Sequence, residues 1–172
     1  MSLRLKRLSH FASVLIAGLV FVILLGRLHV GLVRFFDPDE TAHANWIYLS
    51  SQWYVPYRDF FYYYTPFYHW LLAPVFWFPE GPYLIILLRF IAWGTYVALV
   101  STIYALAYKA SKTHLTALLS CFIFVIFPMT FDKTIEIRPD MLMMLFFFIG
   151  VYLLFETERI HPKRFFTARN MR

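Results

Sequence analysis

The stretch FASVLIAGLVFVILLGRLHVGLV, residues 11–33, decides the fold class because it is an almost unbroken apolar run near the start of the chain. A helix needs about 20 such residues to cross the hydrocarbon core of a bilayer. Basic residues precede the run, as they do in a secretory signal peptide. However, the run is longer than a signal-peptide core, and Arg27, Leu28 and His29 stand where cleavage would require small residues. The run therefore predicts a membrane-spanning helix with a cytoplasmic N-terminus.

The composition of the whole chain supports a membrane environment. Of its 172 residues, 60% are hydrophobic and 15% are charged, whereas a soluble domain is about half apolar and about a quarter charged. The net charge of +6 does not indicate a nucleic-acid partner, because the basic residues cluster at the ends of apolar runs, where they act as topology signals. Cys121 is the one cysteine, so we expect no disulfide and assign it to packing.

Further apolar runs predict the rest of the membrane domain. Three are long enough to be assigned as spans: 83–108, 115–131 and 141–155. The run 67–78 is about a dozen residues, short of the ~20 needed to cross, so we expect it to lie flat on the membrane. With that run flat, every basic cluster falls on the cytoplasmic side, including the tail 159–172. We predict an all-α membrane protein with about four transmembrane helices and two juxtamembrane interfacial helices in the first outer loop, residues 34–82.

The first of these interfacial helices has a clear start signal. In Asp-Pro-Asp-Glu, residues 37–40, Asp37 is suited to the N-cap and Pro38 to the first helical position. Glu40 is suited either to a reciprocal capping box or to a functional site. A stripe of apolar residues follows at helical spacing, formed by Ala42, Trp46, Leu49 and Trp53.

Two acidic groups are predicted to meet at one face of the membrane. The first is 37–40, directly after the first span, and the second is Glu-Ile-Arg-Pro-Asp, residues 136–140, directly before the last. Carboxylates at a water–lipid boundary are costly to desolvate, so they need partners or a function. Asp39 is not required for capping, which makes it the best candidate for chemistry. Asp140 is either a partner of the helix dipole or a functional group.

Other polar residues on this side are weaker candidates. His43 lies one helical turn after Asp39 and could hold a carboxylate or simply face water. Arg58 and Arg138 could meet a phosphate or could serve topology. The candidate substrate-binding residues are these two arginines with His43 and Glu136. Arg27 and Arg34 are expected to snorkel to the outer interface.

A divalent ion is possible, although no ligand spacing requires one. The aromatic stretch 53–77 fits either an interfacial belt or a lipid- or sugar-binding site.

The order of these motifs resembles the membrane glycosyltransferases of the GT-C class, in particular the protein O-mannosyltransferase and aminoarabinose-transferase-like branch. The residues that carry the resemblance are DPDE at 37–40, His43, VPYRDFF at 55–61, YTP at 64–66, AP at 73–74 and RPD at 138–140. Each motif is short. Their order, and their placement on one side of the membrane, make the resemblance specific, and it covers residues 11–155.

The resemblance implies a fold and an activity. Members are polytopic helical proteins that transfer a sugar from a polyprenyl-phosphate carrier to an acceptor hydroxyl, usually with inversion. It implies that Asp39 is the general base and Asp140 a second active-site acid, with Glu40 shaping the site. Because members have more spans, residues 1–158 are expected to be the N-terminal part of such a transmembrane domain, or a truncated copy of it.

The resemblance also implies partners and a location. The partners would be a polyprenyl-phosphate sugar donor, a lipid, glycan or protein acceptor, and membrane lipids. The location would be the inner or plasma membrane, with the acidic loops on the outer face. The alternative is a non-catalytic polytopic membrane protein, such as part of a transporter or an assembly subunit, in which the carboxylates serve only capping and topology.

Overall fold

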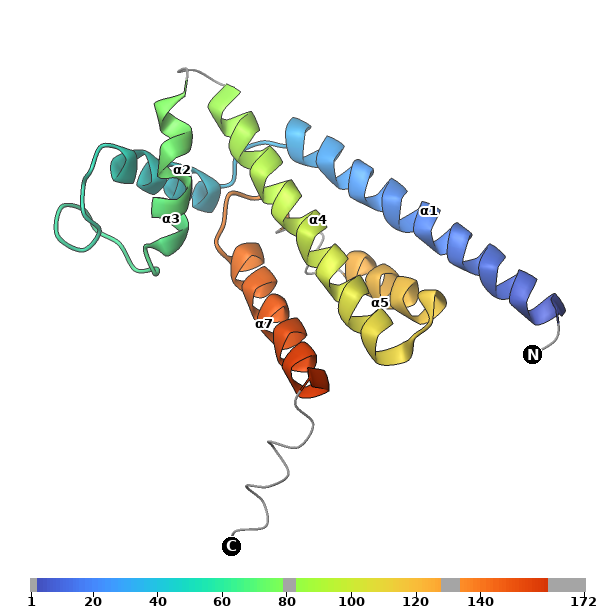
Figure 1. Ribbon diagram of the computed structural model, residues 1–172. Coiled ribbons are helices and arrows are strands. Elements are labelled where there is room, and N and C mark those ends of the chain that lie inside the picture. Colours follow the sequence, from blue (N-terminus) through green and yellow to red (C-terminus); the bar gives the residue numbers. More distant parts are fainter. Residues whose placement is uncertain (1–2, 79–82, 128–133, 161–172) are drawn as a thin grey trace, which may run out of the picture.

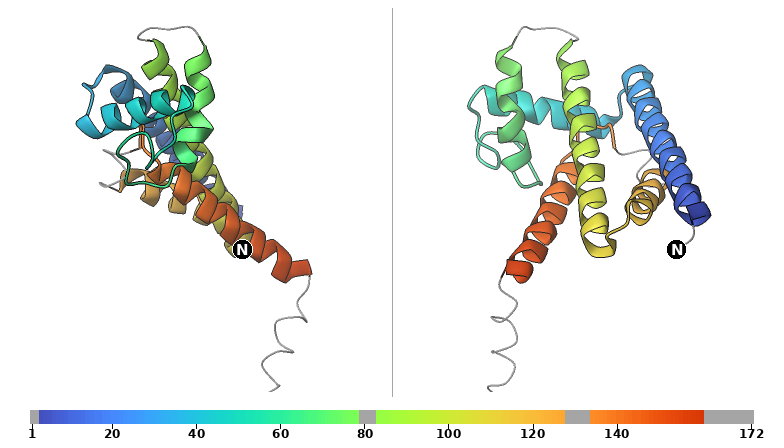
Figure 2. Two further views of the ribbon diagram at one scale, coloured as in Figure 1. Left: turned by 90° about the vertical axis from the view of Figure 1, so that its left-hand side faces the viewer. Right: turned by 45° about the vertical axis from the view of Figure 1, so that its right-hand side comes forward.

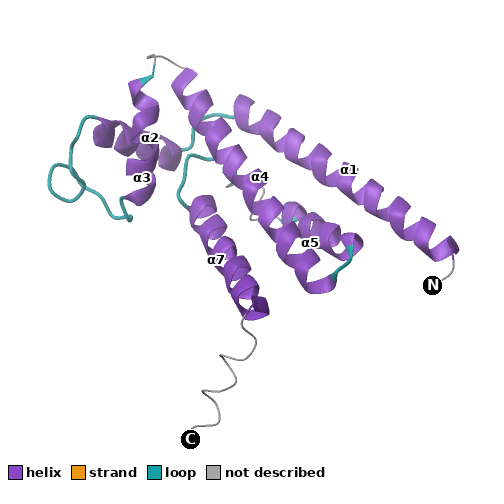
Figure 3. Ribbon diagram, in the orientation of Figure 1, coloured by secondary structure: helices purple, strands orange, loops and turns teal. Residues whose placement is uncertain are grey.

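The computed structural model describes residues 3–78, 83–127 and 134–160, and its regular elements in these segments are all helical (Figures 1 and 3). The elements are α1 (Leu3–Val33), α2 (Pro38–Ser51), α3 (Phe67–Leu72), the 3₁₀ helix η1 (Ala73–Trp77), α4 (Tyr83–Ser111), α5 (His114–Ile126) and α7 (Asp140–Ile160). The predicted all-α class is confirmed. Residues 161–172 of the predicted basic tail lie outside the described residues.

Three helices are long and apolar enough to cross a membrane: α1, α4 and α7. Helix α4 is the central one, because α1, α5 and α7 all pack against it (Figure 2). About 33% of its most apolar 18-residue stretch is buried inside the protein, compared with 6% for α1 and for α7. Their outward side chains, such as Phe11, Phe147 and Leu154, are exposed, as expected for helices that face lipid.

The predicted span 115–131 corresponds to a shorter helix. Helix α5 has 13 residues and ends at Ile126. At about 1.5 Å per residue it reaches about 20 Å, short of a hydrocarbon core of about 30 Å. Residues 128–131 of the predicted span lie outside the described residues. The described residues therefore contain three helices of membrane-crossing length and one shorter apolar helix.

An ion pair marks each of the two ends of the helix bundle. We call the end that carries α2, α3 and residues 134–139 the loop end, and the end that carries the α4–α5 connection the tail end. At the tail end, Lys109 of α4 forms an ion pair with Glu156 of α7. At the loop end, Arg138 joins the start of α7 to α2 through Asp39. Helices α4 and α7 therefore run in the same direction, from the loop end to the tail end (Figure 1).

Helix α2 starts as predicted and lies across the loop end (Figure 2). The Asp37 carboxylate accepts a hydrogen bond from the backbone N–H of Asp39 at 2.9 Å, and Pro38 is the first helical residue. The buried face includes Trp46 and Ile47. The predicted stripe is wrong at Trp53, which follows the helix and is 79% exposed.

The predicted second interfacial helix, 67–78, is divided in two. Helix α3 ends at Leu72, and η1 follows it with Pro74 in its first turn. Proline has no N–H and crowds the preceding turn, so the α-helix cannot continue through it. A buried cluster attaches this region to α4 and to the segment before α7, and it consists of Ile47, Tyr68, Leu72, Leu88 and Ile137.

Arg27 points into the bundle, so the snorkelling predicted for it is wrong. Its side chain is 2% exposed, and Nη1 donates to Thr134 Oγ1 at 3.0 Å. A second donor reaches the carbonyl of Val125, and the guanidinium lies 5.0 Å from the centroid of the Tyr96 ring. The last carbonyls of a helix lack intrahelical partners, so the end of α5 offers acceptors that hold Arg27 inside. The surrounding core contains Cys121, whose predicted packing role is confirmed.

A buried ion pair joins α2 to α4. Arg89 donates from Nε and Nη2 to the two carboxylate oxygens of Glu40, at 2.8 and 2.7 Å. Its Nη1 also donates to the carbonyls of Gly31 and Arg34, at 2.7 and 3.1 Å. The side chains of Arg89 and Glu40 are 4% and 0% exposed. One guanidinium thus fastens the end of α1, the start of α2 and the first turns of α4.

We predict that Arg89→Met destabilises the fold by about 3–5 kcal/mol, because it leaves the Glu40 carboxylate buried without its cation. Unfolding by SDS titration of the protein in mixed micelles measures the loss. Adding Glu40→Gln to Arg89→Met should recover part of it, because no buried charge is then left unpaired.

The matched control is Arg58→Met, which removes an arginine from an exposed pair with Asp59. Such pairs contribute little to stability, so its unfolding midpoint should equal that of the unmodified protein. Equal midpoints for Arg89→Met and Arg58→Met would show that the buried pair does not hold the loop end together.

Candidate functional site

The two predicted acids of the site, Asp39 and Asp140, share one cation. Arg138 donates from Nη1 to Asp39 Oδ2 at 2.8 Å and from Nε to Asp140 Oδ2 at 2.9 Å. The carboxylate side chains are 52% and 43% exposed, whereas that of Arg138 is 17% exposed. Two carboxylates from distant parts of the sequence therefore lie within reach of solvent on either side of a mostly buried guanidinium.

Glu136 lies behind this group and is 1% exposed. Its Oε1 accepts from Arg34 at 2.9 Å, and its Oε2 lies 3.5 Å from Arg138 Nη1. Gly31 allows the segment that carries Glu136 to lie close to α1, because a Cβ at Gly31 would overlap the side chain of Ile135. Glu136 was predicted to bind substrate, but the structure places it where it can orient Arg138. Arg34, which was predicted to snorkel, pairs with Glu136 and stays partly exposed.

The other predicted charged residues occupy different positions. Glu40 is fully buried against Arg89, so it can support the start of α2 but does not face solvent. Arg58 pairs with its neighbour Asp59 in the exposed loop, at 2.8 Å, and its side chain is 72% exposed. Hydrogen bonds from Arg58 and the backbone N–H of Val55 lower the pKa of Asp59 to about 2. Arg58 and Asp59 thus form a local pair outside the Asp39–Arg138–Asp140 group.

His43, one turn after Asp39 on α2, belongs to a buried hydrogen-bonded chain. Its Nδ1 lies 2.9 Å from His69 Nε2, and His69 Nδ1 contacts the hydroxyl of Tyr62. The Tyr62 hydroxyl donates its hydrogen to the carbonyl of Thr65 at 3.0 Å. His69 must therefore donate from Nδ1 to Tyr62, and His43 from Nδ1 to His69 Nε2. This assignment leaves His43 Nε2 as an acceptor.

Both histidines are neutral at neutral pH. Burial lowers the pKa of His43 to about 4, and the positive charge of Arg138 adds to the effect. Burial also lowers the pKa of His69 to about 3, with His43 contributing. Sequence analysis singled out His43 and did not predict its contact with His69. The available signal was one histidine in each of two short helices of the same loop.

A groove opens beside Asp140. Its volume is about 410 Å³, and its lining residues are Tyr64, Thr65, Phe67, Tyr68, Pro139, Asp140, Leu142, Met143 and Phe146. The polar groups lie at the loop end, and the apolar ones continue along α7. The groove therefore has the character of a site for an amphipathic molecule with a polar head at Asp140.

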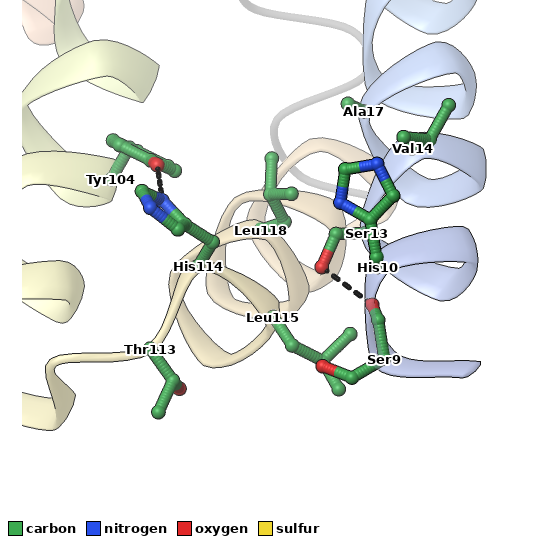
Figure 4. Close-up of a pocket in the computed structure, with 10 residues that line it drawn as sticks. All are labelled: Ser9, His10, Ser13, Val14, Ala17, Tyr104, Thr113, His114, Leu115 and Leu118. Carbon is green, nitrogen blue, oxygen red and sulfur yellow. Dashed lines mark hydrogen bonds between the residues drawn. The ribbon is translucent and has the colours of Figure 1, made fainter. Parts of the chain in front are cut away.

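A larger cavity, about 620 Å³, lies at the tail end (Figure 4). His10 of α1 faces His114 of α5 across it, and His114 Nδ1 is 2.6 Å from the Tyr104 hydroxyl. None of the described residues that line it is acidic. Acid–base chemistry with a carboxylate is therefore better placed in the groove at the loop end.

Comparisons with protein-family models, with curated proteins and with solved structures give no match to this chain. The residues of the site are therefore the evidence for function. Among the described residues, no group of three or more His, Cys, Asp or Glu side chains is arranged to hold a metal ion. At the loop end, the groups available for chemistry are two accessible carboxylates, one arginine and a neutral histidine pair.

We predict that stability falls as pH drops from about 6.5 to about 5. The folded-state pKa values of His43 and His69 lie below 6.5, so the unfolded chain binds more protons in this window. The free energy of unfolding should therefore fall by up to about 1.4 kcal/mol per pH unit for each histidine. SDS titrations at pH 6.5 and pH 5 measure this slope.

The double variant His43→Gln with His69→Gln should lose most of the pH dependence. His114→Gln is the control, because His114 is an exposed histidine at the opposite end of the bundle. A double variant with the slope of the unmodified protein would contradict the assignment of the slope to this pair.

Proposed function

We propose that this chain is the N-terminal part of a GT-C-type membrane glycosyltransferase that transfers a sugar from a polyprenyl-phosphate donor to an acceptor hydroxyl. The observation that carries the proposal is the pairing of Asp39 and Asp140 through Arg138, together with the mostly apolar groove that Asp140 lines. The resemblance of the motifs at 37–40 and 138–140 to that class supports the same assignment.

Asp39 is proposed as the general base. The acceptor oxygen attacks the anomeric carbon, Asp39 takes the hydroxyl proton, and the bond from that carbon to the phosphate oxygen breaks with its electron pair on the phosphate. A single displacement of this kind inverts the anomeric centre. Asp39 is suited to the role because it is half exposed and is not required as the N-cap, which is Asp37.

Arg138 is proposed to stabilise the departing phosphate. A guanidinium can bind phosphate oxygens through two donors, and charge-assisted bonds of this kind are strong. Arg138 is held at present by Asp39 and Asp140, so an incoming phosphate would compete for the same donors. Arg58, for which the same role was predicted, lies outside this group.

The groove along α7 is proposed to receive the isoprenoid chain of the donor. Phe67, Met143 and Phe146 line it, and Asp140 lies at its polar end. A polyprenyl phosphate has the same division into a polar head and an apolar tail, and Arg138, which contacts Asp140, would be the counter-ion of its phosphate. The acceptor, whether lipid, glycan or protein, would then approach Asp39 from the exposed side.

We predict that Asp39→Asn lowers sugar transfer by about 100- to 10,000-fold, the usual contribution of a positioned general base. Asp140→Asn should also lower it. The measurement is transfer of radiolabelled sugar from a polyprenyl-phosphate donor, catalysed by the protein expressed from its whole reading frame and reconstituted in nanodiscs.

The control is Asp59→Asn, which alters a carboxylate of the same loop that pairs with Arg58. It should leave transfer unchanged. Full transfer by both Asp39→Asn and Asp140→Asn would exclude these residues from the reaction. The non-catalytic alternative, a transporter part or an assembly subunit, predicts no transfer by any variant.

We also propose that the chain crosses the membrane four times, with a cytoplasmic N-terminus and the loop end outside. The supporting observation is that Arg34, at the end of α1, and Arg138, before α7, both contact Glu136. The polypeptide must therefore return to the loop end between the end of α4 and residue 134, and α5 is the described helix in that stretch. The inner or plasma membrane is the proposed location.

Cysteine labelling tests this topology in a Cys121→Ser background. We predict that Arg58→Cys reacts with a membrane-impermeant maleimide in intact cells, whereas His114→Cys and Thr157→Cys react only after permeabilisation. Labelling of His114→Cys but not of Arg58→Cys in intact cells would reverse the orientation. Labelling of both from the same side would exclude four crossings.

A further inference from the structure

A second pocket, about 390 Å³, lies at the far end of α2 and is walled by aromatic rings. Trp53, Trp70 and Trp77 are 79%, 54% and 61% exposed. The rings of Trp53 and Trp77 are stacked, with their centroids 6.1 Å apart. Tyr54 also lines the pocket. Exposed apolar surface gathered in one place indicates an interaction site.

The backbone holds these rings in place. Trp53 has a φ of 65°, a left-handed conformation that is uncommon for a bulky residue. It is stabilised by a hydrogen bond from its N–H to the carbonyl of Ser50, at 3.1 Å. The Trp77 indole N–H donates to the carbonyl of Ser51 at 3.3 Å. Strained residues held by their surroundings are typical of functional sites.

The unpaired hydroxyl of Ser50 indicates which kind of ligand the pocket can bind. Ser50 lines the pocket and is 8% exposed, and its Oγ has no hydrogen-bond partner among the described residues. A buried hydroxyl without a partner is costly. An acyl chain or a quaternary ammonium group could fill an aromatic pocket but could not form the missing hydrogen bond. A ligand that carries hydroxyl groups can, once rotation of the Ser50 side chain turns its buried Oγ toward the pocket.

We propose that this pocket binds a neutral carbohydrate. The apolar faces of sugar rings would stack on Trp53, Trp70 and Trp77, and a sugar hydroxyl would pair with Ser50. None of the described residues that line the pocket is charged, so a phosphate or a charged head group would find no counter-ion there. The occupant is therefore an uncharged, hydroxyl-rich molecule with apolar faces.

The position of the pocket defines which part of a substrate it holds. Asp39 lies in the first turn of α2 and Ser50 in the last, so about 17 Å separates them at about 1.5 Å per residue. A short oligosaccharide spans this distance, whereas one sugar does not. Resting on the proposed transferase function, the pocket holds the distal sugars of an acceptor glycan whose reacting hydroxyl lies near Asp39.

Binding of neutral oligosaccharides tests the inference directly. The full chain in nanodiscs is applied to an array of neutral oligosaccharides, and the best-bound one is titrated by saturation-transfer NMR. We expect saturable binding that Ser50→Ala weakens on the order of tenfold, the effect of one hydrogen bond in a buried site. Trp70→Ala should weaken it at least as much.

Ser50→Ala has a second expected readout. Because it removes a buried unpaired hydroxyl, it should leave the thermal midpoint unchanged or raise it while it weakens binding. Phe61→Ala is the matched control, since Phe61 is an 81% exposed aromatic residue of the same loop outside the pocket. It should bind the oligosaccharide as the unmodified protein does.

Two results would overturn the inference: no neutral oligosaccharide on the array is bound by the folded protein, or Ser50→Ala and Trp70→Ala bind as tightly as Phe61→Ala. The transfer assay separates this failure from that of the proposed function. Asp39-dependent transfer with no binding on the array would reject the pocket alone. Pocket-dependent binding with full transfer by Asp39→Asn and Asp140→Asn would reject the proposed chemistry and leave the carbohydrate site standing.

Discussion

The buried ion pair between Glu40 and Arg89 is the interaction on which the loop end depends. Burying two charges is favourable only when their remaining hydrogen-bonding groups are also satisfied. Here both carboxylate oxygens are paired, and the guanidinium also binds carbonyls at the end of α1. Because Asp39 is the residue before Glu40, the pair that joins α2 to α4 also fixes the position of the candidate base.

The exposure of the charged side chains increases from this pair outward to the solvent. Glu40 and Glu136 are 0% and 1% exposed, Arg138 is 17% exposed, and Asp39 and Asp140 are about half exposed. The inner charges therefore have fixed partners, and the outer carboxylates remain accessible. Arg138 belongs to both sets, so a ligand anion that draws it away from Asp39 would leave that carboxylate free to accept a proton.

Local signals in the sequence predicted part of this arrangement. Run length and composition identified the long helices, and Asp37 with Pro38 marked the start of α2. The choice of partners could not be predicted, because it depends on where distant segments end. Arg27 turns inward because α5 ends beside it. Arg89 is a single charged residue in an apolar run, so the sequence does not indicate its partner. The contact between His43 and His69 likewise requires the relative placement of α2 and α3.

Helix α2 carries residues of both candidate sites, and its contacts with neighbouring elements keep it in a fixed position. It is held at its start by Glu40, in its middle by the hydrogen bond from His43 to α3, and at its end by the Trp77 indole on Ser51. A helix fastened at three points along its length cannot tilt without breaking one of them. The separation of Asp39 from Ser50 is thus set by helix geometry rather than by loop conformation. A ligand that occupies both sites would therefore be selected by its length as well as by its chemistry.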